Sequence, residues 1–138
     1  MMEISFTVYM DPVPKNHAKV YPTAHGIRGT QPQRVRTAEA LIRHAAWEQG
    51  DSFPAGTAVK ADIILYMSRP TKCQRVLPTV RPDWDNLGKL VSDAMNKIVY
   101  DDDGQLTDVR VRKRYSEEPR VEVIMTEDQG GDHGTDGK

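Results

Sequence analysis

Two acidic motifs lie at the two ends of one short segment, DWDN at residues 83–86 and DDDG at residues 101–104. Asp83 and Asp85 are two residues apart, and in extended chain this spacing turns both side chains to the same side. Gly104 permits a tight turn, after which the chain can run back beside residues 83–85 and bring Asp103 to the first pair. Clustered carboxylates repel one another, so they require either full solvation or a bound cation. The hard ion Mg²⁺, which prefers oxygen ligands, suits such a set.

Two other interpretations of the aspartates are a calcium loop and ordinary secondary-structure capping. DWDNLG begins like an EF-hand loop, but the twelfth position, which requires a glutamate, is Ala94. Capping is harder to exclude, because Asp85 can be a helix N-cap worth about 1 kcal/mol. Asp101–Asp103 can likewise be a simple polar turn. Spacing alone therefore leaves two possibilities, a metal site or a cap followed by a turn.

Lys89 follows Asp85 by one helical turn. It can form an i, i+4 ion pair, worth about 0.3–0.5 kcal/mol, or supply a cation beside a reacting phosphate. Gly88 is costly inside a helix by about 1 kcal/mol relative to Ala, which close approach of another backbone or of a ligand, or simple tolerance, would explain.

The periodicity of apolar residues places these motifs on a small α/β (α+β) domain. Residues 3–10, 58–67, 106–115 and 120–125 have the composition of strands, and the last two, joined by the turn 116–119, are expected to form a hairpin. Residues 36–49 and 86–98 have helical spacing, with Thr37 as a candidate cap of the first helix and Asp85 or Asn86 of the second. We expect a mixed β-sheet with two helices packed on it, and irregular chain over 11–34 and 68–82. The apolar residues of the first helix are Ala38, Leu41, Ile42, Ala45 and Trp47.

We expect one domain over residues 1–125, followed by a disordered acidic tail over residues 126–138, which contains almost nothing apolar. The single cysteine, Cys73, excludes an internal disulfide and fits a reducing compartment. The sequence contains no apolar run near the roughly 20 residues of a membrane span, and its start is unlike a signal peptide. A cytoplasmic protein without membrane association is therefore expected.

Charge is distributed unevenly along the chain. Residues 1–82 carry 11 Lys and Arg against 6 Asp and Glu, whereas residues 83–138 carry 8 against 14, so the net charges are +5 and −6. Such segregation fits a surface that attracts a polyanion beside a site of acid or metal chemistry, although a solvated surface has the same composition. The residues predicted to contact DNA phosphates are Lys15, Lys19, Arg69, Lys72, Arg75, Arg81, Arg110, Arg112 and Arg114.

The segment RPDWDNLGKLVSDAMNKIVYDDDGQ resembles the RusA family of Holliday junction resolvases. The family pattern has an acidic pair in D-x-D-N, a lysine four residues after the second aspartate, and an aspartate before a small residue and glutamine. The matching positions are Asp83, Asp85, Lys89 and Asp103, with Asp102 as the neighbour one register away. The opening FTVYMDPVPKNHAKV is also similar to that of the family, so the resemblance covers residues 3–125.

The resemblance implies a RusA-like fold and a homodimer that binds four-way DNA junctions and introduces paired nicks in recombination and repair. It implies Mg²⁺, with Mn²⁺ as a substitute, held by Asp83, Asp85 and Asp103, and it implies a catalytic role for Lys89. Two alternatives remain: a DNA-binding module of this fold that has lost the chemistry, and a less selective nuclease that also cuts flaps and forks.

Overall fold

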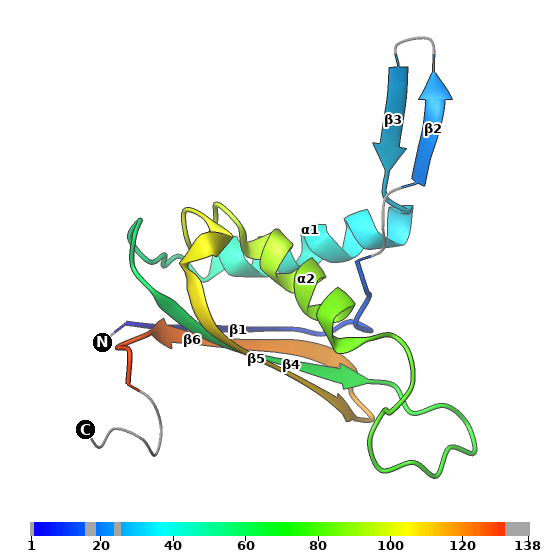
Figure 1. Ribbon diagram of the computed structural model, residues 1–138. Helices are drawn as coiled ribbons and strands as arrows, with labels where there is room; N and C mark the ends of the chain where they lie inside the picture. The colour runs from blue at the N-terminus through cyan, green and yellow to red at the C-terminus, as the bar shows by residue number, and fades with distance from the viewer. Residues whose placement is uncertain (1, 16–18, 24–25, 132–138) are drawn as a thin grey trace.

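The computed structural model describes residues 2–15, 19–23 and 26–131. Strands, helices and one 3₁₀ turn follow one another along the chain (Figure 1). The elements are β1 (Glu3–Val8), β2 (Lys19–Thr23), β3 (Gly26–Thr30), α1 (Gln33–Glu48), β4 (Val59–Met67), α2 (Trp84–Met95), η1 (Asp103–Gln105), β5 (Leu106–Tyr115) and β6 (Arg120–Glu127).

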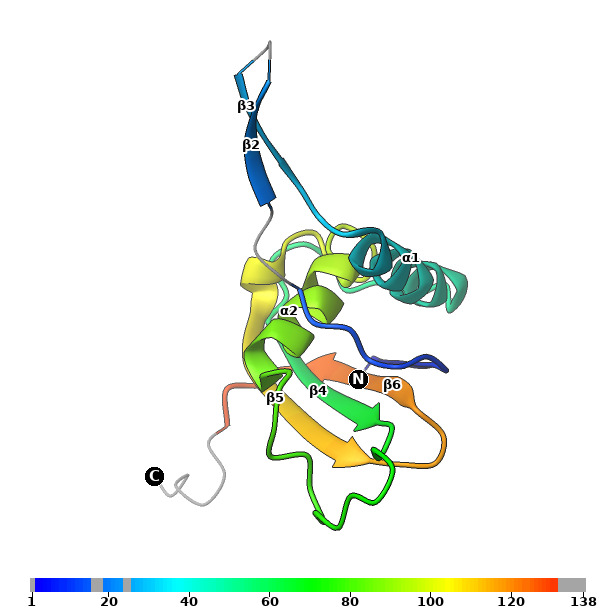
Figure 2. The same cartoon turned by 90° about the vertical axis from the view of Figure 1, so that its right-hand side faces the viewer.

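A four-stranded sheet in the order β1-β6-β4-β5 forms the base of the molecule. β4 and β5 are parallel, whereas β6 is antiparallel to both β1 and β4, so the sheet is mixed as predicted. Both helices lie on the same face of this sheet, and the other face carries no helix among the described residues (Figures 1 and 2). α2 connects the parallel strands β4 and β5, as expected for a crossover connection.

The core lies between that face and the two helices. Alternate residues of β4, from Val59 through Leu65, are buried, as their spacing predicts. α2 buries the predicted residues Leu87, Leu90, Val91 and Ala94 against them. The buried residues of α1 are Val35, Ala38, Ile42 and Ala46.

Two details of α1 differ from the prediction. Leu41 and Trp47 are exposed, at 48% and 66%, because they lie on the side of the helix that points away from the sheet. The helix also begins at Gln33 with Pro32 in the N-cap position, so Thr37 lies inside it rather than capping it.

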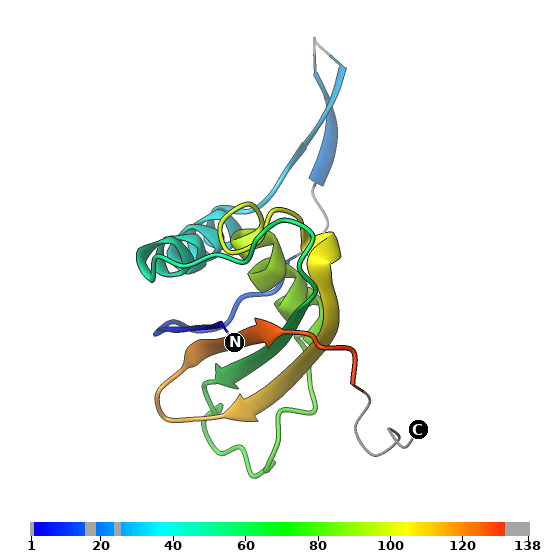
Figure 3. The same cartoon turned by 90° about the vertical axis from the view of Figure 1, so that its left-hand side faces the viewer.

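The segment predicted to be irregular over residues 11–34 contains the antiparallel pair β2–β3 and the first residues of α1. The paired strands stand away from the body of the molecule (Figures 1 and 3). A sequence rich in proline, glycine and basic residues gave no apolar alternation from which to predict them.

The predicted hairpin of residues 106–115 and 120–125 is wrong, because β4 lies between β5 and β6. The connection 116–119 crosses the end of β4, where the Ser116 amide donates to the Met67 carbonyl at 3.0 Å. Because β4 lies between them, β5 and β6 are two strand spacings apart, which is roughly 10 Å. Four residues can reach up to about 13–14 Å, so a short connection does not require its two strands to be neighbours.

β6 also passes the expected domain boundary at residue 125 and ends at Glu127. Asp128, the next residue, is also attached to the domain by hydrogen bonds. Its amide donates to the Ala58 carbonyl, and its carboxylate accepts from the Thr107 hydroxyl at 2.7 Å. The remainder of the predicted disordered tail, residues 132–138, lies outside the described residues. Within the described part of the chain, neither helix has the length and apolar character to cross a membrane.

Candidate functional site

Asp83 and Asp85 lie at the start of α2, on the rim of an open hollow. Asp83 is the N-cap residue of the helix, but its side chain makes no capping hydrogen bond, and Asp85 lies in the first turn. The predicted caps, Asp85 and Asn86, are both inside the helix. Both aspartates are exposed to solvent, next to backbone N–H groups whose partial positive charge favours anions. The hollow is lined by Thr79, Val80, Arg81, Asp83, Trp84, Asp85 and Lys113.

Lys113 fixes the chain directly before the first aspartate. Its ammonium donates to the carbonyls of Val80 and Pro82, both at 2.8 Å. Sequence reasoning noted Lys113 only as the residue opposite the arginines of β5. The alternation along the strand could have identified it, because Lys113 lies on the same strand face as Val109 and Val111. A lysine on a face that packs against a helix needs specific hydrogen-bond partners.

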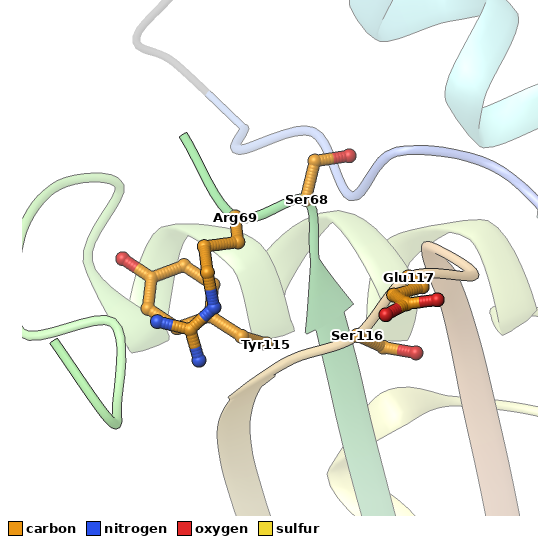
Figure 4. Close-up of a pocket in the computed structure, with 5 residues that line it drawn as sticks. All are labelled: Ser68, Arg69, Tyr115, Ser116 and Glu117. Atoms are coloured by element: carbon orange, nitrogen blue, oxygen red, sulfur yellow. The ribbon is translucent and has the colours of Figure 1, made fainter. Parts of the chain in front are cut away.

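The loop 68–82, which leads to the aspartates, is held at the end of β5 by Tyr115. The Arg75 guanidinium donates to the Tyr115 hydroxyl at 3.2 and 3.3 Å, and the Arg69 guanidinium lies 4.5 Å from the centre of the Tyr115 ring. Arg69 also donates to the Arg75 carbonyl. Figure 4 shows Arg69 over Tyr115, beside a second hollow formed with Ser68, Ser116 and Glu117. Arg69 and Arg75, which were predicted to contact DNA, thus hold the loop in place.

The second acidic motif is built into a turn at the opposite end of α2. The Asp102 carboxylate accepts from the Gly104 amide at 2.8 Å, and the Gln105 side-chain oxygen accepts from the amides of Asp101 and Asp102. The Gln105 side-chain nitrogen donates to the carbonyls of Pro54 and Thr57. This part of the motif is accordingly a capping box that attaches the turn to the 54–57 loop.

Asp103 does not join Asp83 and Asp85 within one chain. The turn at Gly104 does reverse the chain, but β5 then runs back along α2 and reaches residues 80–82 only at Lys113. The 12 residues of α2 extend over roughly 18 Å, and this length separates the two motifs (Figure 1). In the described part of the chain, no three His, Cys, Asp or Glu side chains are close enough to share a metal ion. The expected convergence of three aspartates is wrong for the single chain.

Lys89 forms its ion pair with Asp93, at 3.1 Å, rather than with Asp85. Asp93 also pairs with Lys15 at 3.2 Å, and Lys15 pairs with Glu39 of α1 at 2.6 Å. Burial lowers the pKa of Lys15, but the hydrogen bonds to Glu39 and Asp93 outweigh burial, and the net pKa is raised. Lys15, which was predicted to contact DNA, is therefore held between the two helices.

Gly88 has a structural explanation in the packing of α2 on β5. A Cβ atom at this position would lie 3.1 Å from Cγ2 of Val111. The close neighbour is therefore a valine side chain of the underlying strand, rather than the backbone or ligand considered from the sequence.

The other predicted DNA contacts lie in two regions. Arg81 lines the aspartate hollow, and Lys72 is exposed on the loop before it. Because Val111 faces α2, Arg110, Arg112 and Arg114 point to the sheet face without helices, where Arg112 pairs with Asp62 at 3.4 Å. The side chain of Lys19 lies outside the described residues. The structure thus places Arg81 beside the aspartates and the three arginines of β5 on the opposite face.

The hollow provides some, but not all, of the ligands expected for a divalent metal ion. Asp83 and Asp85 supply the one or two carboxylates that Mg²⁺ commonly takes from a protein, alongside substrate phosphates and water. The third carboxylate that the resemblance implies is not available from the same chain. One chain therefore provides an acidic pair with Arg81 and Lys113 near it, but not the complete set.

Comparison with known proteins gives two matches. The family model described as "Endodeoxyribonuclease RusA" matches residues 10–126. An uncharacterized protein of Bacillus subtilis (strain 168), YqaN, is 32% identical over 136 residues, covering 90% of this chain and 96% of the relative. The matched region includes both acidic motifs and both helices.

Proposed function

Because this chain belongs to the RusA family of endodeoxyribonucleases, we propose that it resolves four-way DNA junctions by paired symmetric nicks, in a reaction that depends on Mg²⁺. Membership of this family establishes that the protein is a nuclease. The four-way junction as substrate, the dependence on Mg²⁺ and the paired nicks are what we propose. Recombination and repair are the processes that produce such junctions.

The observation that carries the proposal is the exposed pair Asp83 and Asp85 on a hollow that also contains Arg81 and Lys113. Phosphodiester hydrolysis needs cationic groups to hold the backbone and carboxylates to hold a metal ion. When bound, such an ion activates water and stabilises the leaving oxygen. The position of Arg81 on the same hollow supports a phosphate contact, and the hydrogen bonds of Lys113 to residues 80 and 82 support a fixed position for Asp83.

Lys89 is proposed as the catalytic lysine on the strength of its place in the motif. Its side chain is 58% exposed and pairs with Asp93 across one helical turn, which is an exposed pair of modest strength. Such a pair can be exchanged for a substrate phosphate without leaving a buried charge behind.

The test is nicking of a synthetic four-way junction labelled on each strand in turn, with Mg²⁺, with Mn²⁺ and with a chelator. We expect nicks at symmetric positions on two opposing strands with either metal and none with the chelator. Linear duplex, flap and fork substrates of the same sequence serve as controls. Equal cutting of flaps and forks would replace junction selectivity with a broader nuclease activity.

A DNA-binding module without catalysis is the second candidate, and it is favoured by the separation of Asp103 from the other two aspartates within the chain. It predicts a gel shift of the junction without product in either metal. Binding of junctions should weaken as salt rises, because lysine and arginine contacts release counterions from the phosphates. Binding without any cleavage, under conditions that saturate the junction, would overturn the nuclease proposal.

A further inference from the structure

Trp84, the residue between the two aspartates of the candidate site, lines the hollow and is 61% exposed to solvent. A tryptophan in this position forgoes much of the apolar burial that its ring could gain, so packing does not explain it. Val80, which lines the same hollow, is also exposed, at 45%. Single exposed apolar residues are common, but apolar side chains grouped in one hollow and bordered by charged ones are typical of binding sites.

The exposure of Trp84 follows from where α2 begins. Trp84 is three residues before Leu87 and four before Gly88, so it extends the buried stripe of the helix by one turn. Gly88 packs on Val111, but the next residue on that face of β5 is Lys113, whose ammonium donates to backbone carbonyls. The helix therefore begins beyond the apolar part of the strand, and the indole is left on the hollow.

The groups beside Trp84 indicate what can occupy the space next to its ring. In the proposed function, the phosphate that is cut lies at Asp83 and Asp85, with Arg81 on the same hollow. The base of that nucleotide is joined to the phosphate through one sugar, so it is within reach of the residue between the two carboxylates. The hollow, at about 830 Å³, has room for a flat ring beside the DNA backbone. A nucleobase is therefore the flat, partly apolar group that fits this position.

We propose that Trp84 stacks on the base next to the phosphate that is cut, and that this contact selects branched DNA over continuous duplex. The inference rests on the proposed function for the position of the phosphate. In a continuous duplex both faces of a base are covered by its neighbours, whereas at a branch point the stack is interrupted and a face becomes available. An indole accepts any base, because every base has a π-face, so the contact selects DNA structure rather than sequence.

The second tryptophan of the chain supplies a matched comparison. Trp47 is exposed to a similar degree, 66%, but lies near the end of α1 and outside the hollow. The sequence contains these two tryptophans and no others, so one substitution isolates the fluorescence of either ring.

The first test measures tryptophan fluorescence of the full chain in the presence of a chelator, so that no strand is cut. Trp47→Phe leaves Trp84 as the fluorescent residue, and Trp84→Phe leaves Trp47. Each protein is titrated with a synthetic four-way junction and with a linear duplex of the same sequence, and the bound fraction is measured by gel shift. The junction should quench Trp84 at least about twofold at saturation, because a stacked base quenches an indole. The duplex should quench it much less at the same bound fraction, and Trp47 should not respond to either DNA.

The second test measures the affinity of both DNAs for variants at the two positions. Trp84→Ala should weaken binding of the junction roughly ten- to a hundredfold and binding of the duplex less, since one stacked base is lost. Trp84→Phe keeps an aromatic ring and should retain most of the preference for the junction. Trp47→Ala is the control and should leave both affinities unchanged. An unaltered ratio of junction to duplex affinity in Trp84→Ala would overturn the role of this ring in selectivity.

The fluorescence experiment also separates the stacking contact from its alternatives. A bound junction that leaves Trp84 fluorescence unchanged would overturn stacking, and equal quenching by the duplex would overturn selectivity. A signal that changes when the protein alone is diluted, and not when DNA is added, would overturn the proposal in favour of a contact between protein molecules. Quenching without any cleavage in Mg²⁺ would overturn the nuclease and leave the stacking contact in place, whereas cleavage without quenching would do the reverse.

Discussion

The two ends of α2 carry the same residue type in opposite environments. At the start of the helix, Asp83 and Asp85 are exposed on an open hollow, and the Asp83 side chain does not cap the helix. At the other end, the Asp102 carboxylate caps a 3₁₀ turn, and Gln105 ties that turn to the 54–57 loop. The buried Tyr100 lies next to this second group and donates its hydroxyl to the Ser92 carbonyl at 2.8 Å.

This difference indicates which acidic residues contribute to the stability of the fold and which are available for chemistry. Side chains that satisfy backbone groups are needed for the fold, and replacing them leaves donors or acceptors unpaired. Exposed carboxylates beside a hollow contribute little to the fold and remain available for a ligand. Asp103 lies at the end of α2 where the aspartates are structural, although the sequence motif groups it with Asp83 and Asp85.

The largest expected effect is on activity, at the start of the helix. Asp83→Asn should lower the rate of junction nicking at least about a hundredfold, since losing one metal-binding charge removes several kcal/mol of transition-state stabilisation. The midpoint of thermal unfolding should change little, because the side chain makes no capping bond and its charge at the helix N-terminus is worth only about 0.3–1 kcal/mol. Asp51→Asn, at an exposed aspartate after α1, is the control and should retain full activity. Normal nicking by the Asp83 variant would remove Asp83 from the site.

At the other end of α2 the largest effect should be on stability. Gln105→Ala removes hydrogen bonds to the carbonyls of Pro54 and Thr57 and to two amides of the turn. The free energy of unfolding in urea should fall by about 1–2 kcal/mol, because four backbone groups lose their side-chain partner and the bond to Thr57 is partly buried. Gln74→Ala, at an exposed loop glutamine, should change it little. A loss for Gln105→Ala no larger than for the control would show that the turn does not depend on this side chain.

Tyr100 provides a test of the same region through pH. Burial, followed by the negative charges of Asp103, Asp93 and Asp102, raises the pKa of Tyr100 above its ordinary value. In the unfolded chain the phenol ionises near pH 10, whereas in the folded protein it stays protonated to higher pH. The stability that Tyr100 contributes is therefore present below pH 10 and is lost as the pH rises further.

Tyr100→Phe should accordingly be less stable than the wild type at pH 8, by about 1 kcal/mol for the lost hydrogen bond to Ser92. The difference should shrink between pH 10 and pH 11. Unfolding in urea at both pH values measures it, and the other tyrosines and lysines cancel in the comparison. A difference that stayed constant with pH would contradict the raised pKa.

The smallest effect concerns the middle of the helix, where α2 meets β5. Gly88→Ala should destabilise the protein by about 1 kcal/mol, because the new methyl group meets Val111 at 3.1 Å and the strain exceeds the gain in helix propensity. In a Val111→Ala background the same change should be stabilising by a similar amount. Equal effects in both backgrounds would exclude Val111 as the reason for the glycine.

Local patterns determined much of what the sequence could reveal. The alternation of β4 and the helical spacing of α2 were sufficient to identify those elements and their buried faces, because periodicity reports which side of an element is buried. The same alternation correctly set the arginines of β5 on one face and Val111 on the other. β2 and β3 could not be found in this way, because their segment shows no apolar alternation.

The acidic motifs and their match to the RusA family were also present in the sequence itself, because a motif is a matter of residue identity and spacing. The order of the strands and the distance between the motifs were decided by the tertiary structure. β4 lies between β5 and β6, and Ile63 and Ile64, which point to opposite faces of this interior strand, are both buried. Once β5 runs back along α2, Asp103 must lie a helix length from Asp83, and no local pattern contains that distance.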